Sequence, residues 1–382
     1  MKFRLLYLNY EYPPVGGGGG TTSAFLTRHM ADHGHQIYVV TGGVPGCFGI
    51  EQASSNVTIE RLNTTRTRID SCTRPQMLIY VAQAALLLKS RIDKFKPDLL
   101  HIFFGFPTGA VLPLSFFQQF TRMSYIISLF GGDVPGVDPS TNLLHTMLLP
   151  LTRTLWMNAA AVVPNSQKLA HLAKQTLDIP MPVITNGVDL NMFRPDGRTR
   201  GSVVRMLFAG RLREQKGLDV LLKALSLACN QLPPWRLTIL GDGPFRETYE
   251  SLSRELNLET LLDWRGWVAL EELPQVYQNH DIFVLPSRYE GMSSVVLQAM
   301  ASGCAIVSSD VFGADEMVTD GENGYIVEVG NAAMMADRLI AICQPRSLEA
   351  MQRSSVKLSA EFSWKNIGGQ YEELYSSSLR HS

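Results

Sequence analysis

The chain has 382 residues, of which 45% are hydrophobic and 18% are charged, and its formal net charge is −1. This composition is that of a globular protein and excludes a disordered chain, while the length predicts two domains rather than one. The near-neutral charge, without interleaved basic and aromatic residues, argues against nucleic-acid binding. Five cysteines are scattered without close pairs, which favours a reducing compartment and argues against a metal cluster.

The N-terminal residues MKFRLLYLNYEYPP predict a first strand rather than a secretory signal, because they contain no cleavage site and no long apolar region. The sequence contains no run of 18 uncharged apolar residues, so no membrane span is predicted. A cytoplasmic location is therefore expected. Residues 1–183 carry a net charge of +5 and residues 184–382 carry −6. This asymmetry is explained either by chance or by contact with an anionic acceptor or membrane surface. The basic residues that would make a membrane contact are Arg66, Arg68, Arg74, Lys89, Arg91, Lys94 and Lys96.

Short apolar runs alternate with helical patterns through the first half. Strands are predicted at residues 3–9, 36–41, 57–62, 98–103, 125–129, 160–163 and 182–184, and helices at 22–33, 76–95 and 166–177. Alternation of this kind is typical of a parallel sheet with helices on both faces.

A run of five glycines, residues 16–20, lies between the first predicted strand and the first predicted helix. The helix is expected to have its N-cap among Thr21, Thr22 and Ser23. Glycines let a backbone approach a ligand closely, so Gly16, Gly17, Gly18 and Gly19 are candidate ligand-binding residues. The alternative is a flexible surface turn. The G-x-G-x-x-G spacing of a dinucleotide site is absent.

The same alternation restarts after a polar stretch, residues 196–202, which predicts a linker or surface loop. Strands are predicted at residues 203–209, 236–240, 261–265, 282–285, 305–308 and 325–327. The expected domains are residues 1–183 and 184–362, two doubly wound units with a ligand cleft between them. Residues 363–382 form a third segment, in which residues 363–378 predict an amphipathic helix.

Arg211 and Lys216 lie in a predicted loop that follows the apolar strand MLFAG. Arginine donates two parallel hydrogen bonds to phosphate oxygens and lysine adds a mobile charge, so the pair could neutralise a diphosphate without a metal ion. The alternative is two solvated surface cations.

Glu290 follows the predicted strand DIFVLP and precedes a turn of small residues and a predicted helix. Backbone N–H groups at such a turn bind phosphate, whereas a carboxylate there repels phosphate and accepts hydrogen bonds from hydroxyl groups. The expected ligand is therefore a sugar joined to a phosphate. The turn residues concerned are Gly291, Met292, Ser293 and Ser294.

In the order and spacing of its motifs, the chain resembles the retaining, nucleotide-sugar-dependent glycosyltransferases of family 4, which have the GT-B fold. The resemblance covers the whole chain, through YPPVGGGGG, NGVDLNMFRP, AGRLREQKG, LGDGP, RYEGMSSVVLQAMASG and FSWKNIGGQYEELY. It implies two Rossmann-like domains facing across a cleft, with the last helix returning to the first domain. It also implies a nucleoside-diphosphate sugar donor, with UDP favoured, a hydroxyl acceptor of unidentified type, and no metal or other cofactor.

The resemblance assigns roles to individual residues. The glycine run faces the phosphate and sugar of the donor, and Arg211 and Lys216 bind the diphosphate. Glu290 binds the sugar hydroxyls and stabilises positive charge at the anomeric carbon. Gly241 lies beside the nucleotide, and Trp267 lies at the nucleobase, unless it is a buried structural residue. Residues 45–56 and 63–74 are expected to be loops that contact the acceptor.

The sequence departs from the family pattern at two positions. Gln298 stands where the family has a second glutamate that binds the ribose, and Phe130 stands where many relatives have a histidine. Asp133 is the nearest group able to accept from a hydroxyl, so it is a candidate catalytic residue, with a turn-forming role as an equal alternative. His101 is expected to be buried and structural. These departures leave open a non-catalytic nucleotide-sugar-binding protein, and a phosphorylase or hydrolase is a third hypothesis.

Overall fold

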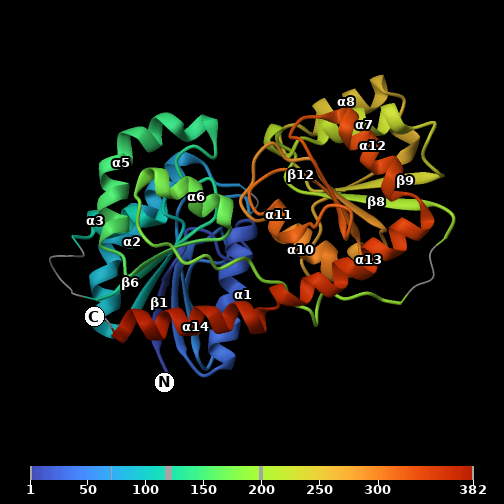
Figure 1. The fold of residues 1–382 in the computed structure, drawn as a ribbon. Coiled ribbons are helices and arrows are strands. Elements are labelled where there is room, and N and C mark those ends of the chain that lie inside the picture. Colours follow the sequence, from blue (N-terminus) through green and yellow to red (C-terminus); the bar gives the residue numbers. More distant parts are fainter. Residues whose placement is uncertain (1, 70, 117–122, 198–200, 381–382) are drawn as a thin grey trace. The chain divides into compact units, whose positions relative to one another are not determined.

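The computed structural model describes residues 2–69, 71–116, 123–197 and 201–380 (Figure 1). The chain divides into two compact units. Unit 1 comprises Met1–Gly187 and Trp364–Ser382, and unit 2 comprises Val188–Ser363. The first unit therefore ends at Gly187 rather than at residue 183, where the sequence predicts the boundary. The C-terminal segment that begins at Trp364 belongs to unit 1.

Unit 1 contains a seven-stranded sheet in the order β3-β4-β2-β1-β5-β6-β7. The strands are β1 Arg4–Leu8, β2 Gln36–Gly42, β3 Gly49–Ser54, β4 Val57–Leu62, β5 Leu99–Phe103, β6 Tyr125–Leu129 and β7 Ala161–Pro164. All neighbours are parallel except the edge strand β3, which pairs antiparallel with β4. Without β3, this is the doubly wound order.

The described helices of unit 1 are α1 Gly18–Asp32, α2 Arg74–Phe95, α3 Val111–Leu114, α5 Asn142–Met157, α6 Gln167–Thr176 and α14 Trp364–Arg380, with 3-10 turns at Thr108–Ala110 and Pro139–Thr141. Their ends follow local chemistry. A capping box between Thr73 and Gln76 begins α2, and the Ser166 hydroxyl accepts from the Leu169 N–H at the start of α6.

Unit 2 contains a six-stranded, all-parallel sheet in the order β10-β9-β8-β11-β12-β13, again doubly wound. Its strands are β8 Val204–Ala209, β9 Trp235–Leu240, β10 Leu262–Gly266, β11 Ile282–Leu285, β12 Ala305–Ser309 and β13 Gly324–Val327. Its described helices are α7 Leu218–Ala228, α8 Arg246–Glu255, α9 Leu273–Gln278, α10 Ser294–Ala301, α11 Ala314–Met317, α12 Ala332–Ile342 and α13 Pro345–Ser359, with 3-10 turns at Glu214–Lys216, Glu259–Leu261 and Ala360–Phe362. Helices cover both faces of the sheet, so β8, β9, β11 and β12 are almost wholly buried, whereas the edge strand β10 has no buried residue.

The last helix, α14, is fastened to the sheet of unit 1 by a buried network of hydroxyl and imidazole groups. The hydroxyls of Tyr7 and Tyr375 are 2.9 Å apart, and Tyr375 Oη lies 2.8 Å from His101 Nδ1. His101 Nε2 lies 2.8 Å from Ser128 Oγ, which is 3.1 Å from Tyr371 Oη. Burial holds the pKa of His101 well below its ordinary value, so the ring is neutral. The expected return of the last helix and the structural role of His101 are both confirmed.

Three parts of the chain differ from the predicted elements. Residues 182–184 are not a strand. Strand β3 lies inside the expected acceptor loop 45–56, and every residue of β3 is exposed, so the sequence has no apolar alternation there that could reveal a strand. The predicted linker 196–202 includes residues 198–200, which lie outside the described residues.

Candidate functional site

The loops that follow three neighbouring strands of unit 2 are joined by backbone hydrogen bonds. The Gly210 N–H donates to Leu240 O at 3.0 Å, and the Gly241 N–H donates to Gly266 O at 2.6 Å. Gly241 has a φ of +114°, and a Cβ there would lie under 3.0 Å from the Gly210 carbonyl oxygen. Only glycine fits this approach. Gly241 therefore holds the loops after β8, β9 and β10 together at the carboxyl edge of the sheet.

Lys216 and Glu290, which the sequence assigns to different parts of a ligand, form an ion pair. Lys216 Nζ donates to Glu290 Oε1, and the Ser287 hydroxyl donates to the same oxygen at 2.9 Å. Both side chains are mostly buried, with exposed fractions of 16% for Lys216 and 13% for Glu290. Gly217 allows the loop after β8 to approach, since a Cβ there would lie under 3.0 Å from the Pro286 carbonyl. The half-buried Arg211 lies in the same loop as Lys216.

A second ion pair, which the sequence does not reveal, fixes the segment before Glu290. Both terminal nitrogens of Arg288 donate to the Asp219 carboxylate at 2.9 Å, and Arg288 also donates to Glu214 O at 2.7 Å. Burial alone raises the pKa of Asp219, but the hydrogen bonds from Arg288 bring that pKa below its ordinary value. Such a bidentate pair fixes geometry as well as charge. Arg288 is therefore a positioning residue for Glu290.

The residues between Glu290 and helix α10 lie where the sequence places them. Met292 and Ser293 are buried, whereas Gly291 and Ser294 are half-buried. Ser293 is the N-cap of α10. The N-terminus of a helix carries partial positive charge and favours anions. Glu290 and this helix N-terminus thus both follow β11, and the loop after β8 brings Lys216 to Glu290.

Gln298 and Trp267 occupy environments that the sequence leaves undecided. Gln298 lies on α10 with only 6% of its surface exposed, and its Oε1 accepts from the Tyr277 hydroxyl at 3.1 Å. The oxygen expected to bind ribose is thus bonded within the interior of unit 2. Trp267 directly follows β10 and is 60% exposed, so the alternative of a buried structural tryptophan is wrong.

The glycine run of unit 1 is a packed helix start. Helix α1 begins at Gly18 with Gly17 as its N-cap, so the N-cap expected among residues 21–23 is wrong. The Gly17 N–H donates to Glu11 Oε2 at 3.0 Å, and a Cβ on Gly19 would lie under 3.0 Å from the Phe104 ring. The run is glycine-rich because neighbouring residues fill the space, which does not fit a flexible surface turn.

Glu11 is a buried acidic residue that the sequence analysis missed. It is 5% exposed, and its carboxylate lies at the N-terminus of α1. A negative charge is favourable at this end of a helix. The available signal was a lone acidic residue between the first strand and the glycine run.

Asp133 has the geometry of a turn-forming residue. It is 4% exposed and accepts backbone hydrogen bonds from Gly105 at 2.7 Å, Phe130 at 2.9 Å and Gly131 at 2.8 Å. Burial raises the pKa of Asp133, and the backbone donors offset only part of that rise. Both carboxylate oxygens thus join the loops after β5 and β6. Phe130 packs on Phe104 with ring centroids 4.9 Å apart.

Comparisons with known proteins cover both units. A family model described as "Glycosyltransferase Family 4" matches residues 16–192, and one described as "Glycosyl transferases group 1" matches residues 193–357. The N-acetyl-alpha-D-glucosaminyl L-malate synthase of Bacillus anthracis is 22% identical over 97% of this chain and 96% of its own length.

Solved structures show the same fold. Sucrose-phosphate synthase from Thermosynechococcus elongatus matches with a TM-score of 0.86 and 21% identity over 100% of both chains. HepE of Anabaena, in complex with UDP and glucose, matches with a TM-score of 0.76 and 19% identity, over 98% of this chain and 100% of its own. The two doubly wound units are therefore those of the GT-B fold. The two matched family models and the shared fold show that the chain is a family 4-like glycosyltransferase of the GT-B fold.

Proposed function

We propose that the protein transfers a sugar from a nucleoside-diphosphate sugar to a hydroxyl acceptor, with retention of configuration at the anomeric carbon. The observation that carries this proposal is the Lys216–Glu290 ion pair beside the start of α10. A bound diphosphate would draw the Lys216 ammonium to its own oxygens, because the two negative charges of the diphosphate attract a cation more strongly than the single charge of one carboxylate does. Glu290 would then be released to accept from the hydroxyl groups of the sugar.

In this mechanism Arg211 and Lys216 neutralise the charge that develops on the leaving diphosphate, together with the N-terminus of α10. Donors that point at developing charge usually make the largest single contribution to rate. Glu290 stabilises the positive charge at the anomeric carbon. The leaving phosphate oxygen takes the acceptor proton on the same face, so no protein base is required. This mechanism assigns no step to Asp133, whose oxygens accept from backbone N–H groups.

The proposed donor is a UDP-sugar. HepE, which shares the fold, has been solved with UDP, with UDP-glucose, and with UDP and glucose. The exposed Trp267 follows Gly266, whose carbonyl accepts from Gly241, so the indole is available to a nucleobase near these loops. Gln298 would serve the ribose through its NH2 group or through the second lone pair of Oε1, which already accepts from Tyr277. Calorimetry with a Gln298→Glu variant tests this: an unchanged affinity for UDP would place the side chain in the interior alone.

The proposed contact of unit 1 with an anionic membrane has fewer residues than the sequence indicated. Arg66 is 1% exposed and donates to the carbonyl oxygens of Arg68 and Ile69, and Arg91 is paired with Glu60. Among the residues that the structure describes, none of the helices combines the length and apolar character that a bilayer crossing needs. Co-sedimentation with anionic and neutral vesicles at low and high salt tests what remains of this contact.

The function is tested by supplying UDP-sugars in turn without acceptor, with inorganic phosphate, and with glycan or lipid hydroxyl acceptors. A thermal-shift screen of nucleotide sugars first fixes the donor. We expect turnover only with a hydroxyl acceptor, a product that keeps the anomeric configuration of the donor, and no loss of turnover with EDTA. Binding of a UDP-sugar without any transfer would support the non-catalytic alternative, and an inverted product would refute the retaining mechanism.

A further inference from the structure

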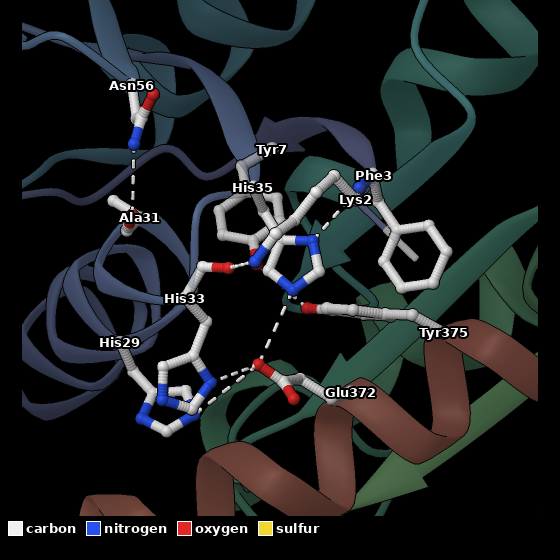
Figure 2. Close-up of polar contacts among 10 residues, drawn as sticks. All are labelled: Lys2, Phe3, Tyr7, His29, Ala31, His33, His35, Asn56, Glu372 and Tyr375. Atoms are coloured by element: carbon white, nitrogen blue, oxygen red, sulfur yellow. Dashed lines mark hydrogen bonds and ion pairs between the residues drawn. The ribbon is translucent and has the colours of Figure 1, made fainter.

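Three histidines and one glutamate converge at the C-terminal end of α1 in unit 1 (Figure 2). His29 lies in the last turn of α1, His33 directly follows the helix, and His35 precedes β2. All three rings face Glu372 of α14. The distances to Glu372 Oε1 are 3.9 Å from His29 Nε2, 2.5 Å from His33 Nδ1 and 3.4 Å from His35 Nε2.

The ligand atoms of His29, His33 and Glu372 all lie within 4.8 Å of one another. The His29 side chain is only 9% exposed, and its Nε2 has no hydrogen-bond partner. A buried polar nitrogen without a partner costs free energy in the folded state. Coordination to a metal ion would supply the partner that this nitrogen lacks.

The fold brings these groups together through two local features. His29 and His33 are four residues apart, which is the spacing that places two side chains on one side of a helix end. Gly368 of α14 lets the second helix approach, because a Cβ there would lie under 3.0 Å from the His29 ring. The segment HMADHGH, residues 29–35, carries this spacing in the sequence.

His35 is a third histidine beside the Glu372 carboxylate and helps to orient it. Its Nδ1 accepts from the Phe3 N–H at 3.0 Å, so a neutral ring carries its hydrogen on Nε2, which faces Glu372. Groups that hold a metal ligand in place in this way are common around zinc. One feature opposes a cation: the Lys2 ammonium donates to the His33 carbonyl oxygen nearby.

We propose that His29, His33 and Glu372 bind Zn²⁺ or a similar divalent transition metal, which clamps α14 to α1. Two imidazoles and one carboxylate suit Zn²⁺, whereas Mg²⁺ and Ca²⁺ prefer sites made of oxygen. Water fills the fourth position, supplied from an adjoining cavity of about 490 Å³ whose lining includes His33, Glu372 and Ser376.

Binding requires a small local adjustment. Ligand atoms about 2.0 Å from a tetrahedral ion are ~3.3 Å apart, so the 2.5 Å between His33 and Glu372 must widen. His33 is 49% exposed and Glu372 is 30% exposed, so both have room to move. The site is structural, because it lies at the opposite end of α1 from the glycine run and shares no residue with the Lys216–Glu290 pair.

The test measures Zn²⁺ binding to the full chain after chelation, by competition with a chromophoric chelator, together with the Zn²⁺-induced shift in Tm. We expect one ion per chain and a rise in Tm. Glu372→Gln and His33→Ala should each weaken binding by more than the roughly 10–100-fold that follows loss of a merely orienting group. Matched controls are Glu373→Gln on the same helix and His171→Ala on α6, which alter exposed residues of the same types and should leave binding unchanged.

Cysteines are the competing ligands, so the same variants are examined with Co²⁺. A spectrum without a thiolate charge-transfer band, lost in Glu372→Gln, supports the site. No binding to the wild type, equal binding in all four variants, or a thiolate band would overturn it. Sugar transfer by Glu372→Gln below its melting temperature should equal that of the wild type, so failure of this proposal is distinguishable from failure of the proposed function.

Discussion

The two units share one strand order but differ in the chemistry at the carboxyl edges of their sheets. In unit 2 this edge carries the Lys216–Glu290 pair, supported by Arg288. In unit 1 the glycine run packs against Phe104, and Phe130 lies beside the same ring. The fold therefore fixes where a site can form, and the loops decide its chemistry.

Acidic residues follow strands in both units, with different partners. Glu290 accepts from the side chains of Lys216 and Ser287, whereas Glu11 and Asp133 accept from backbone N–H groups. A carboxylate held by backbone groups is part of the fold, because moving it would break the loop. A carboxylate held by a lysine can exchange its partner when an anion arrives. This contrast locates the charge-based chemistry in unit 2.

Removing both cations should produce the largest effect. Arg211→Ala with Lys216→Ala should weaken binding of the nucleoside diphosphate, with each lost charge-assisted contact worth about 1.5–3 kcal/mol. Isothermal calorimetry with UDP measures the change. Arg236→Ala, which alters an exposed arginine of β9, is the control. Unchanged affinity in the double variant would remove the phosphate role and the contrast between the units.

The Glu290→Gln variant should fold normally and lose roughly two orders of magnitude or more in turnover, as expected when an electrostatic stabiliser is neutralised. Steady-state kinetics with a verified donor and acceptor measures this. Glu322→Gln changes an exposed glutamate of unit 2 and should leave turnover intact. Wild-type turnover by Glu290→Gln would show that this carboxylate is structural, like those of unit 1.

The two units differ at their sheet edges but not in their interiors, because each interior holds a buried neutral histidine, His101 in unit 1 and His280 in unit 2. His280 Nδ1 donates to Val276 O at 2.6 Å and Nε2 lies 2.8 Å from Thr238 Oγ1. Burial lowers the pKa of His280 from 6.5 to about 4. As the pH falls, the His280 ring is therefore protonated in the unfolded chain before it is protonated in the folded one. Its contribution to stability is complete above pH 6.5 and is lost as the pH falls from 6.5 toward 4.

The loss amounts to at most about 3 kcal/mol in the free energy of unfolding. Denaturant titrations between pH 7 and 4 should show a shallower decline for His280→Gln than for the wild type, whereas His171→Gln, an exposed control, should follow the wild type. Parallel curves for His280→Gln and the wild type would contradict the assignment.

In unit 1, glycine substitutions should change stability according to packing. Gly19→Ala places a Cβ against the Phe104 ring and should lower the free energy of unfolding by about 1–3 kcal/mol. Gly369→Ala, in α14 with no atom within 4 Å of the new Cβ, should raise it by about 0.5–1 kcal/mol. Thermal unfolding of both variants provides the check. Equal stability of the two would show that the glycine run is not packed.

The strands were largely predictable because buried parallel strands are continuous apolar runs, as in β4 and β6, which match their predicted bounds. The exposed β3 has no such signal. The sequence predicts that Glu290 and Lys216 follow apolar strands, but it does not predict their ion pair. That pair depends on the close approach of two loops, which the missing side chain of Gly217 allows. The bond between Gln298 and Tyr277 likewise joins side chains that only tertiary packing brings together.

The hydroxyl network around Tyr375 has a consequence for the order in which the chain is synthesised. Unit 2 is continuous in sequence, whereas unit 1 needs the segment that begins at Trp364 to complete its sheet-facing contacts. At ordinary rates of translation, the 176 residues of Val188–Ser363 take on the order of ten seconds or more to emerge. During that interval His101 and Tyr7 lack the hydroxyl of Tyr375. The N-terminal half of the nascent protein therefore stays incomplete until the segment that begins at Trp364 has emerged from the ribosome.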